Sequence, residues 1–186
     1  MVVSNVEVYG LNESIKGSKY PMAVDVTKLN SDVTPTVVKL ATSKHGEGHD
    51  NWLNGIIVQF DLTFTNKAWV EAERYHFLDF VSSQSTMHRI TKFDLDKAYI
   101  EYVDPRMVEI MKEKVKDYNA SPSPEKYLEI LYSNPAGFRL TARMTTNYRQ
   151  LKTIYKQRRT HRLPEWQEFC DWCKTLPYHE FITGGE

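Results

Sequence analysis

GIIVQFDLTFT, residues 55–65, has the clearest β-strand pattern in the sequence. Its even-numbered positions are all apolar, and its odd-numbered positions from 59 onward are polar. Successive side chains of a strand point to opposite faces, so the residues fall into two sets. One set is Ile56, Val58, Phe60, Leu62 and Phe64, and the other is Ile57, Gln59, Asp61, Thr63 and Thr65. Because β-branched and aromatic residues also favour extended backbone, this stretch predicts a strand.

A helix over residues 66–76 and a hydroxyl-rich loop are expected directly after this strand. Thr65 or Asn66 can cap the helix. Aromatic and small residues then recur at helical spacing, at Trp69, Ala72, His76 and Phe80. We expect residues 66–90 to lie against a second, basic helix over residues 147–162, and the two segments to form a site.

The remaining pattern predicts a mixed α+β fold in which helices dominate. Strands are expected over residues 2–11 and, as a short extended piece, 23–26. Residues 12–32 are polar and rich in turn residues, and 138–144 fit a strand or a helix. Helices are expected after the capping residues Thr34, Asp104 and Ser123, each followed by proline, after Thr145 or Thr146, and over 164–176. Residues 94–102 have an ambiguous pattern with a helical bias.

Composition narrows the class of protein. The 186 residues suit one domain, residues 1–186, with a tail at 178–186 that we expect to be loose. Lys plus Arg and Asp plus Glu both number 24, so bulk charge gives no sign of nucleic-acid or membrane binding. No apolar run reaches the roughly 20 residues of a membrane helix, and no signal peptide is expected. With two cysteines, a cytoplasmic location is expected.

A local excess of positive charge lies in residues 139–162. This stretch contains eight cations and no acid: Arg139, Arg143, Arg149, Lys152, Lys156, Arg158, Arg159 and Arg162. Arginine suits bidentate phosphate contacts, so an anion site is one interpretation, and a solvated basic face is the other. The interleaved aromatic and glycine residues of nucleic-acid modules are missing, which argues against RNA or DNA as the ligand.

Three smaller motifs have competing interpretations. His45 and His49, in a loop with acids, suit a ligand-contacting loop better than a metal site. Cys170 and Cys173 have redox spacing but occupy the middle of an aromatic-rich helix, which favours packing. Residues 82–89 carry hydroxyls and end on His88–Arg89. They fit an anion-binding loop or an ordinary loop that follows a helix. They lack the Ser-His-Asp order and the glycine-flanked nucleophile of serine hydrolases.

The order of these segments resembles the flavin-dependent thymidylate synthases. That family carries R-H-R-x-x-S-x-N-E-x-S-x-R-Y after a helix, and the pattern falls on FLDFVSSQSTMHRI, residues 77–90. Ser82 and Arg89 match, and Gln84 replaces Asn. Downstream, NYRQL at residues 147–151 resembles the family's N-A-R-S-L. The resemblance spans about residues 37–175.

The resemblance implies roles for particular residues. Nucleotide contacts fall on Ser82, Arg89, Arg149 and Arg158, with Arg158 at the position that orients the uracil ring. Cofactor contacts fall on His49, Gln84 and Asn147. The family fold implies a small, mostly antiparallel sheet packed with several helices, and the family assembly implies a homotetramer with sites shared between subunits.

The family's flavin motif is absent from this sequence. Phe77, Leu78 and Asp79 replace R-H-R, so no cation is present and Asp79 would repel a phosphate. Each lost charge-assisted contact is worth about 1.5–3 kcal/mol, which should abolish ordinary FAD affinity.

Two functions follow as hypotheses. The first is a diverged thymidylate synthase-like protein that binds a dUMP-like pyrimidine nucleotide; as an enzyme it would be a methyltransferase acting at uracil C5 with FAD. The second is a non-catalytic binding or scaffolding protein of the same fold. Catalytic residues are not assigned, and no metal site is predicted.

Overall fold

The computed structural model describes residues 1–44 and 46–185. A four-stranded antiparallel sheet forms its centre, in the order β1-β2-β4-β3. The strands are β1 (Val2–Tyr9), β2 (Ile57–Thr65), β3 (Asp79–Ser83) and β4 (Arg139–Asn147). The predicted α+β class with a small antiparallel sheet is therefore confirmed.

The alternating stretch forms β2, one of the two inner strands. Val58, Phe60, Leu62 and Phe64 are fully buried, while Gln59, Asp61 and Thr63 lie half-exposed on the opposite face. Burial of one face fixes the register with β4, because a shift of one residue would expose every aromatic ring.

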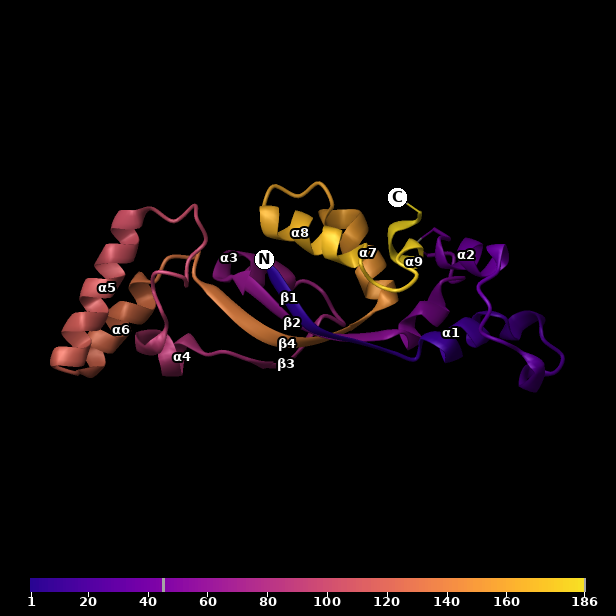
Figure 1. The fold of residues 1–186 in the computed structure, drawn as a ribbon, viewed down its shortest axis with the longest axis horizontal. Coiled ribbons are helices and arrows are strands. Elements are labelled where there is room, and N and C mark those ends of the chain that lie inside the picture. Colours follow the sequence, from indigo (N-terminus) through magenta and orange to yellow (C-terminus); the bar gives the residue numbers. More distant parts are fainter. Residues whose placement is uncertain (45, 186) are drawn as a thin grey trace.

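Helices α7 (Tyr148–Arg158) and α8 (Pro164–Cys173) lie on the concave side of the curved sheet (Figure 1). They cover the buried face of β2 with aromatic residues. Phe64 contacts Trp166 edge to face, with ring centroids 5.0 Å apart, and Phe60 packs against Phe169. This main core also includes α3 (Asn66–Ala72).

The molecule is elongated, with helices at both ends of the sheet (Figure 1). One end carries α1 (Leu11–Ser18), α2 (Pro35–Ala41) and α9 (Glu180–Thr183). The other carries α4 (Thr86–Arg89), α5 (Pro105–Ala120) and α6 (Pro124–Ser133) around a small second core, which includes Met111, Ile130 and Phe138. Short 3₁₀ helices span Tyr20–Met22, Val26–Lys28, Asn51–Gly55 and Ile90–Lys92.

Four predicted caps are confirmed. Thr34, Thr65, Asp104 and Ser123 each accept a backbone N–H bond at the start of a helix. The predicted cap at Thr145 or Thr146 is wrong, because β4 continues to Asn147 and the Asn147 side chain caps α7 instead.

The helix predicted over residues 66–76 is too long. It ends at Ala72, and Phe77 adopts a left-handed backbone with φ of 65°, which a continuing helix does not allow. Residues 79–83 then pair with β4 as a strand. The hydroxyl-rich segment, residues 82–89, therefore belongs partly to β3 and partly to the short helix α4 (Thr86–Arg89).

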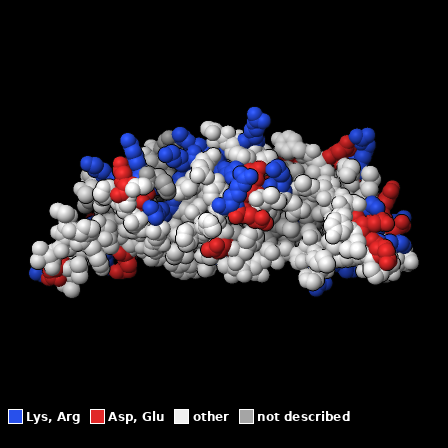
Figure 2. All heavy atoms as spheres, turned by 180° about the vertical axis from the view of Figure 1, so that it is seen from behind, with Lys and Arg blue, Asp and Glu red and all other residues white. Residues whose placement is uncertain are grey.

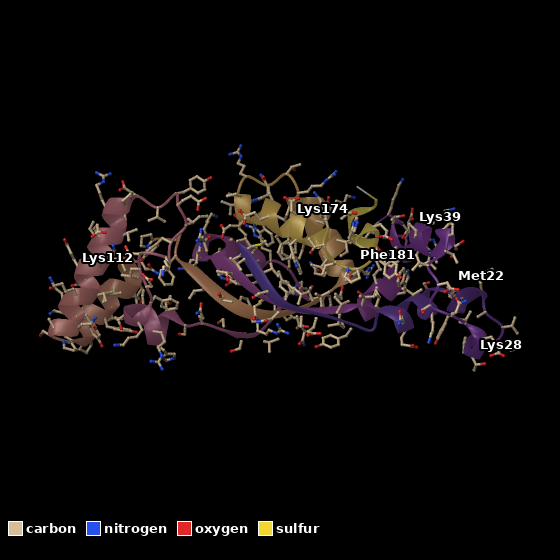
Figure 3. All side chains as sticks on the ribbon, viewed as in Figure 1. Met22, Lys28, Lys39, Lys112, Lys174 and Phe181 are labelled. Carbon is tan, nitrogen blue, oxygen red and sulfur yellow. The ribbon has the colours of Figure 1, made fainter. Side chains whose placement is uncertain are left out.

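Other local predictions were also wrong. Residues 11–18 form a helix, residues 23–25 lie between two 3₁₀ helices with Val26 beginning the second, and residues 94–102 form turns with one isolated bridge. The expected loose tail instead packs, because α9 places Phe181 and Ile182 in the main core. Figure 3 shows Phe181 between α7 and the α1–α2 end.

The apolar residues of α5 are unequally buried. Met107 and Ile110 are 40% and 42% exposed, while Met111 is fully buried. No helix among residues 1–44 and 46–185 is long and apolar enough to cross a membrane.

Candidate functional site

A charged cluster holds the N-terminal end of α7. Arg149 Nε donates to Asp50 Oδ1 at 3.1 Å, and Lys152 Nζ donates to Asp50 Oδ2 at 2.7 Å. Lys152 also donates to the carbonyls of Ala41 and Ser43, so it closes the C-terminal end of α2. Asp50 is 1% exposed and therefore depends on these two cations for its charge to be tolerated.

Burial alone raises the pKa of the Asp50 carboxyl. The hydrogen bond and charge of Lys152, together with those of Arg149, outweigh burial, so the pKa lies below its usual value. Asp50 is consequently ionised at neutral pH. Its single negative charge faces the two positive charges of Arg149 and Lys152, so the cluster carries a net positive charge.

A cavity of about 550 Å³ opens beside this cluster, between the end of α2, the outer side of α7 and α9. Its lining includes the cations Lys44, Lys152, Lys156 and Arg159, and among its described lining residues Asp50 is the one acid. Seen from behind, Lys and Arg gather along the side of the molecule that carries α7 and α8 (Figure 2).

A second charged cluster holds the C-terminal end of α7. Arg158 Nη1 donates to Glu71 Oε2 at 2.9 Å, and its Nε donates to the Tyr75 hydroxyl at 2.6 Å. The guanidinium also lies 4.7 Å from the centroid of the Trp166 ring. With 8% of the residue exposed, Arg158 is bound within the chain in this conformation.

The β3–α4 segment presents polar groups at the edge of the sheet. Ser82 and Arg89 are exposed, and their side chains make no hydrogen bond or ion pair within the described residues. Gln84 prolongs the pairing of β3, since its side-chain oxygen accepts from Thr141 N and its backbone N–H donates to Thr141 O.

The structure divides the predicted site residues among three places. Ser82, Gln84 and Arg89 lie on the β3–α4 segment. His49, Asn147 and Arg149 lie near the start of α7, and Arg158 lies near its end. His45 lies outside the described residues.

The first two groups are separated by most of β4. Gln84 pairs with Thr141 near one end of this strand, and Asn147 ends the other. Six residues of strand span about 20 Å, and Arg89 lies farther along still. Within one chain, Arg89 and Arg149 therefore do not converge on one ligand.

The residues at the expected flavin position do not fit FAD in the way that the resemblance implies. Leu78 is buried in the main core, and Phe77 presents an exposed ring. Asp79 adds an exposed carboxylate at the start of β3. Where the resemblance requires cations, the chain offers two apolar side chains and one acid.

The cysteine pair has the packing role favoured by its position. Both thiols are buried, and burial raises the pKa of Cys170 to about 11 and that of Cys173 well above its usual value. Such thiols are poor nucleophiles and metal ligands at neutral pH. Within the described part of the chain, no group of His, Cys, Asp and Glu is arranged to hold a metal ion.

The sequence did not reveal that Asp50 and Glu71 organise the two ends of α7; Asp50 was considered only as an acid of the His45–His49 loop. Each is about 90 to 100 positions from the arginine it binds. Local spacing carries no signal for such pairs. The excess of cations in residues 139–162 was the available hint that acids from elsewhere would be required.

Comparison with known proteins establishes the fold. No family model and no curated protein matches the sequence. The structure is similar to that of the flavin-dependent thymidylate synthase ThyX from Helicobacter pylori complexed with FAD and dUMP. That likeness has a TM-score of 0.71 and 13% identity, and it covers 98% of this chain and 97% of the other.

A UMP/dUMP methylase, PolB from Streptomyces cacaoi, bound with 5-Br UMP is also similar, with a TM-score of 0.63 and 14% identity. The match covers 99% of this chain and 95% of that one. The chain therefore has the flavin-dependent thymidylate synthase fold, as the sequence resemblance predicted.

Proposed function

We propose that this chain is a diverged flavin-dependent thymidylate synthase-like protein that binds a pyrimidine nucleotide of the dUMP type. One observation carries the proposal. Its fold matches, over nearly the whole chain, that of proteins whose structures hold dUMP or 5-Br UMP. Two cations at positions matching the family motif support it.

Arg89 and Arg149 are the anion contacts in this proposal. The Arg89 side chain is exposed and forms no ion pair with an acid among the described residues. Arg149 uses only its Nε toward Asp50, so its two terminal nitrogens remain for a phosphate. Ser82, seven residues before Arg89 in the motif, adds an exposed hydroxyl on β3. Arg158 contributes only if it leaves Glu71 and Tyr75.

The proposed site forms between copies of the chain. Arg89 and Arg149 lie toward opposite ends of β4, so one nucleotide can meet both only if they come from different subunits. The homotetramer implied by the resemblance supplies such an arrangement. Light scattering of the purified protein tests it, and a monomer at all concentrations contradicts a shared site.

The proposed nucleotide binding does not require flavin, and we propose no catalytic reaction for this chain. One-carbon transfer to uracil C5 is the activity that the resemblance implies, with flavin as its hydride source. Because residues 77–79 do not fit FAD, the site best supports binding of the nucleotide without flavin chemistry.

Thermal unfolding with dUMP, UMP and deoxyuridine tests the proposal. The two nucleotides should raise Tm through binding to the folded state, and the nucleoside, which lacks the phosphate, should not. Arg89→Gln should weaken binding by roughly ten- to a hundredfold, since a hydrogen bond to a charged group is worth about 1.5–3 kcal/mol. Arg74→Gln, which changes another exposed arginine, is the matched control.

Two results would overturn parts of the proposal. Absence of any shift with either nucleotide would reject nucleotide binding and favour the non-catalytic scaffolding protein. Flavin absorbance retained after purification, or gained on titration with FAD, would show that the replaced motif still accepts the cofactor.

A further inference from the structure

The cavity beside Asp50 has the size of a small-molecule site. It measures about 550 Å³, within the range of about 300–1,000 Å³ typical of ligand pockets. None of Ser82, Arg89, Arg149 and Arg158 lines it, so its lining differs from the nucleotide contacts proposed above, although Asp50 lines the cavity and also binds Arg149.

Three lysines and Arg159 supply the positive charge of this cavity. Lys152 is fully engaged, because its three N–H groups reach Ala41 O, Ser43 O and Asp50. Lys44 and Lys156 are exposed, and within the described residues neither ammonium group has an ion pair. Both can therefore approach an anion without breaking an existing bond.

Hydroxyl groups add neutral donors. Ser43 Oγ is buried and has no hydrogen-bond partner among the described residues. The Thr183 hydroxyl accepts from Gly185 N at 3.3 Å, which leaves its own hydrogen to donate. A buried polar group without a partner costs free energy, and a ligand acceptor would remove that cost.

The cavity also has apolar lining. Tyr155 and Ile182 contribute to its wall, and both are at least 95% buried. Apolar surface next to donors and cations suits a molecule with an organic part and an anionic group.

We propose that this cavity binds a small phosphorylated molecule. Lys44 and Lys156 contact its phosphate, Ser43 and Thr183 donate hydrogen bonds, and its organic part packs against Tyr155 and Ile182. Lysine ammonium groups serve as point charges for phosphate, and the mixed lining explains why the cavity is larger than a phosphate alone requires.

Isothermal titration with phenyl phosphate, inorganic phosphate and phenol tests both parts of the proposal. Phenyl phosphate should bind more tightly than inorganic phosphate, and phenol should not bind. Added sodium chloride should weaken binding, since it screens the lysines. Equal affinity for phenol and phenyl phosphate would overturn the phosphate assignment, and no binding of any probe would overturn the site.

Two variants locate the site. Lys44→Gln/Lys156→Gln should bind phenyl phosphate roughly ten- to a hundredfold more weakly, whereas Lys39→Gln/Lys116→Gln, with the same change in charge, should bind as the original chain does. Ser43→Ala should weaken binding without lowering Tm, because its hydroxyl has no partner to lose. Unchanged affinity in the Lys44/Lys156 variant would place the anion elsewhere and refute the proposal.

The experiment also separates this site from the nucleotide site. Arg89→Gln should leave the binding of phenyl phosphate unchanged, and Lys44→Gln/Lys156→Gln should leave the dUMP-induced rise in Tm unchanged. If Arg89→Gln abolished both, the two ligands would share one site and the proposal of a separate cavity site would be wrong.

Discussion

The two ends of α7 are each held by a carboxylate from a distant part of the chain. Asp50, at the N-terminal end, binds Arg149 and Lys152. Glu71, at the C-terminal end, binds Arg158 at 2.9 Å, and His161 joins it when protonated. Both acids have a pKa that is lowered by neighbouring positive groups against the effect of burial.

The helix dipole makes these two clusters unequal. Cations are unfavourable at the N-terminal end of a helix and favourable at its C-terminal end. Arg149 and Lys152 therefore depend on Asp50, whereas Arg158 is also stabilised by the helix end, the Tyr75 hydroxyl and the Trp166 ring. Asp50 is also the more deeply buried acid, so the N-terminal end should tolerate the loss of its carboxylate less well.

The largest effect is expected from the packing at the N-terminal end of α7. Phe181 is fully buried against Trp52, with ring centroids 5.3 Å apart, and α9 packs on α7. Phe181→Ala should lower the free energy of unfolding by about 3–5 kcal/mol through lost burial and a cavity. Urea denaturation measures this loss. Tyr132→Ala, at a site 88% exposed, is the control and should change stability by less than about 0.5 kcal/mol.

Asp50→Asn should have the next largest effect. It leaves two cations at the positive end of α7 and should cost about 2–4 kcal/mol at pH 7. Because the folded-state pKa of Asp50 is lowered, its contribution is present above the unfolded pKa of about 3.9 and is lost as pH falls through the folded value. Urea denaturation should therefore show a difference between the two proteins that is constant from pH 7 to 5 and shrinks below about pH 4. A difference that stayed constant in acid would show that the carboxylate charge is not responsible.

Much of the fold followed from local pattern. The alternation in residues 55–65 identified β2, and the Thr34, Asp104 and Ser123 caps located the starts of α2, α5 and α6. Each of these signals is contained within a short stretch of sequence. The left-handed turn at Phe77 and the packed α9 could not be predicted in this way. The strand that follows Phe77 pairs with β4, and α9 packs into the main core, so both regions depend on residues distant in sequence, where intrinsic propensity is a weak guide.

The candidate site was less predictable than the fold. The sequence grouped Arg89, Arg149 and Arg158 because all three are cations that match a family pattern. The structure separates them, since β4 holds Arg89 and Arg149 far apart and Glu71 holds Arg158 within the chain. Residue type and order reveal which side chains can bind an anion, but only the positions of opposing acids reveal which of them are available.

Glu71→Gln tests the C-terminal half of the comparison and should cost less than Asp50→Asn, about 1–2 kcal/mol at pH 7. Arg158 keeps its bond to Tyr75, its contact with Trp166 and the favourable helix end, and the Gln side-chain oxygen can still accept from it. Lys67→Gln removes an i,i+4 partner of Glu71 that is 56% exposed, so it should change stability by at most about 0.5 kcal/mol. Urea denaturation of the three variants at one pH ranks them directly. If Glu71→Gln cost as much as Asp50→Asn, neither the helix dipole nor the deeper burial of Asp50 would distinguish the two clusters, and the asymmetry inferred for α7 would be wrong.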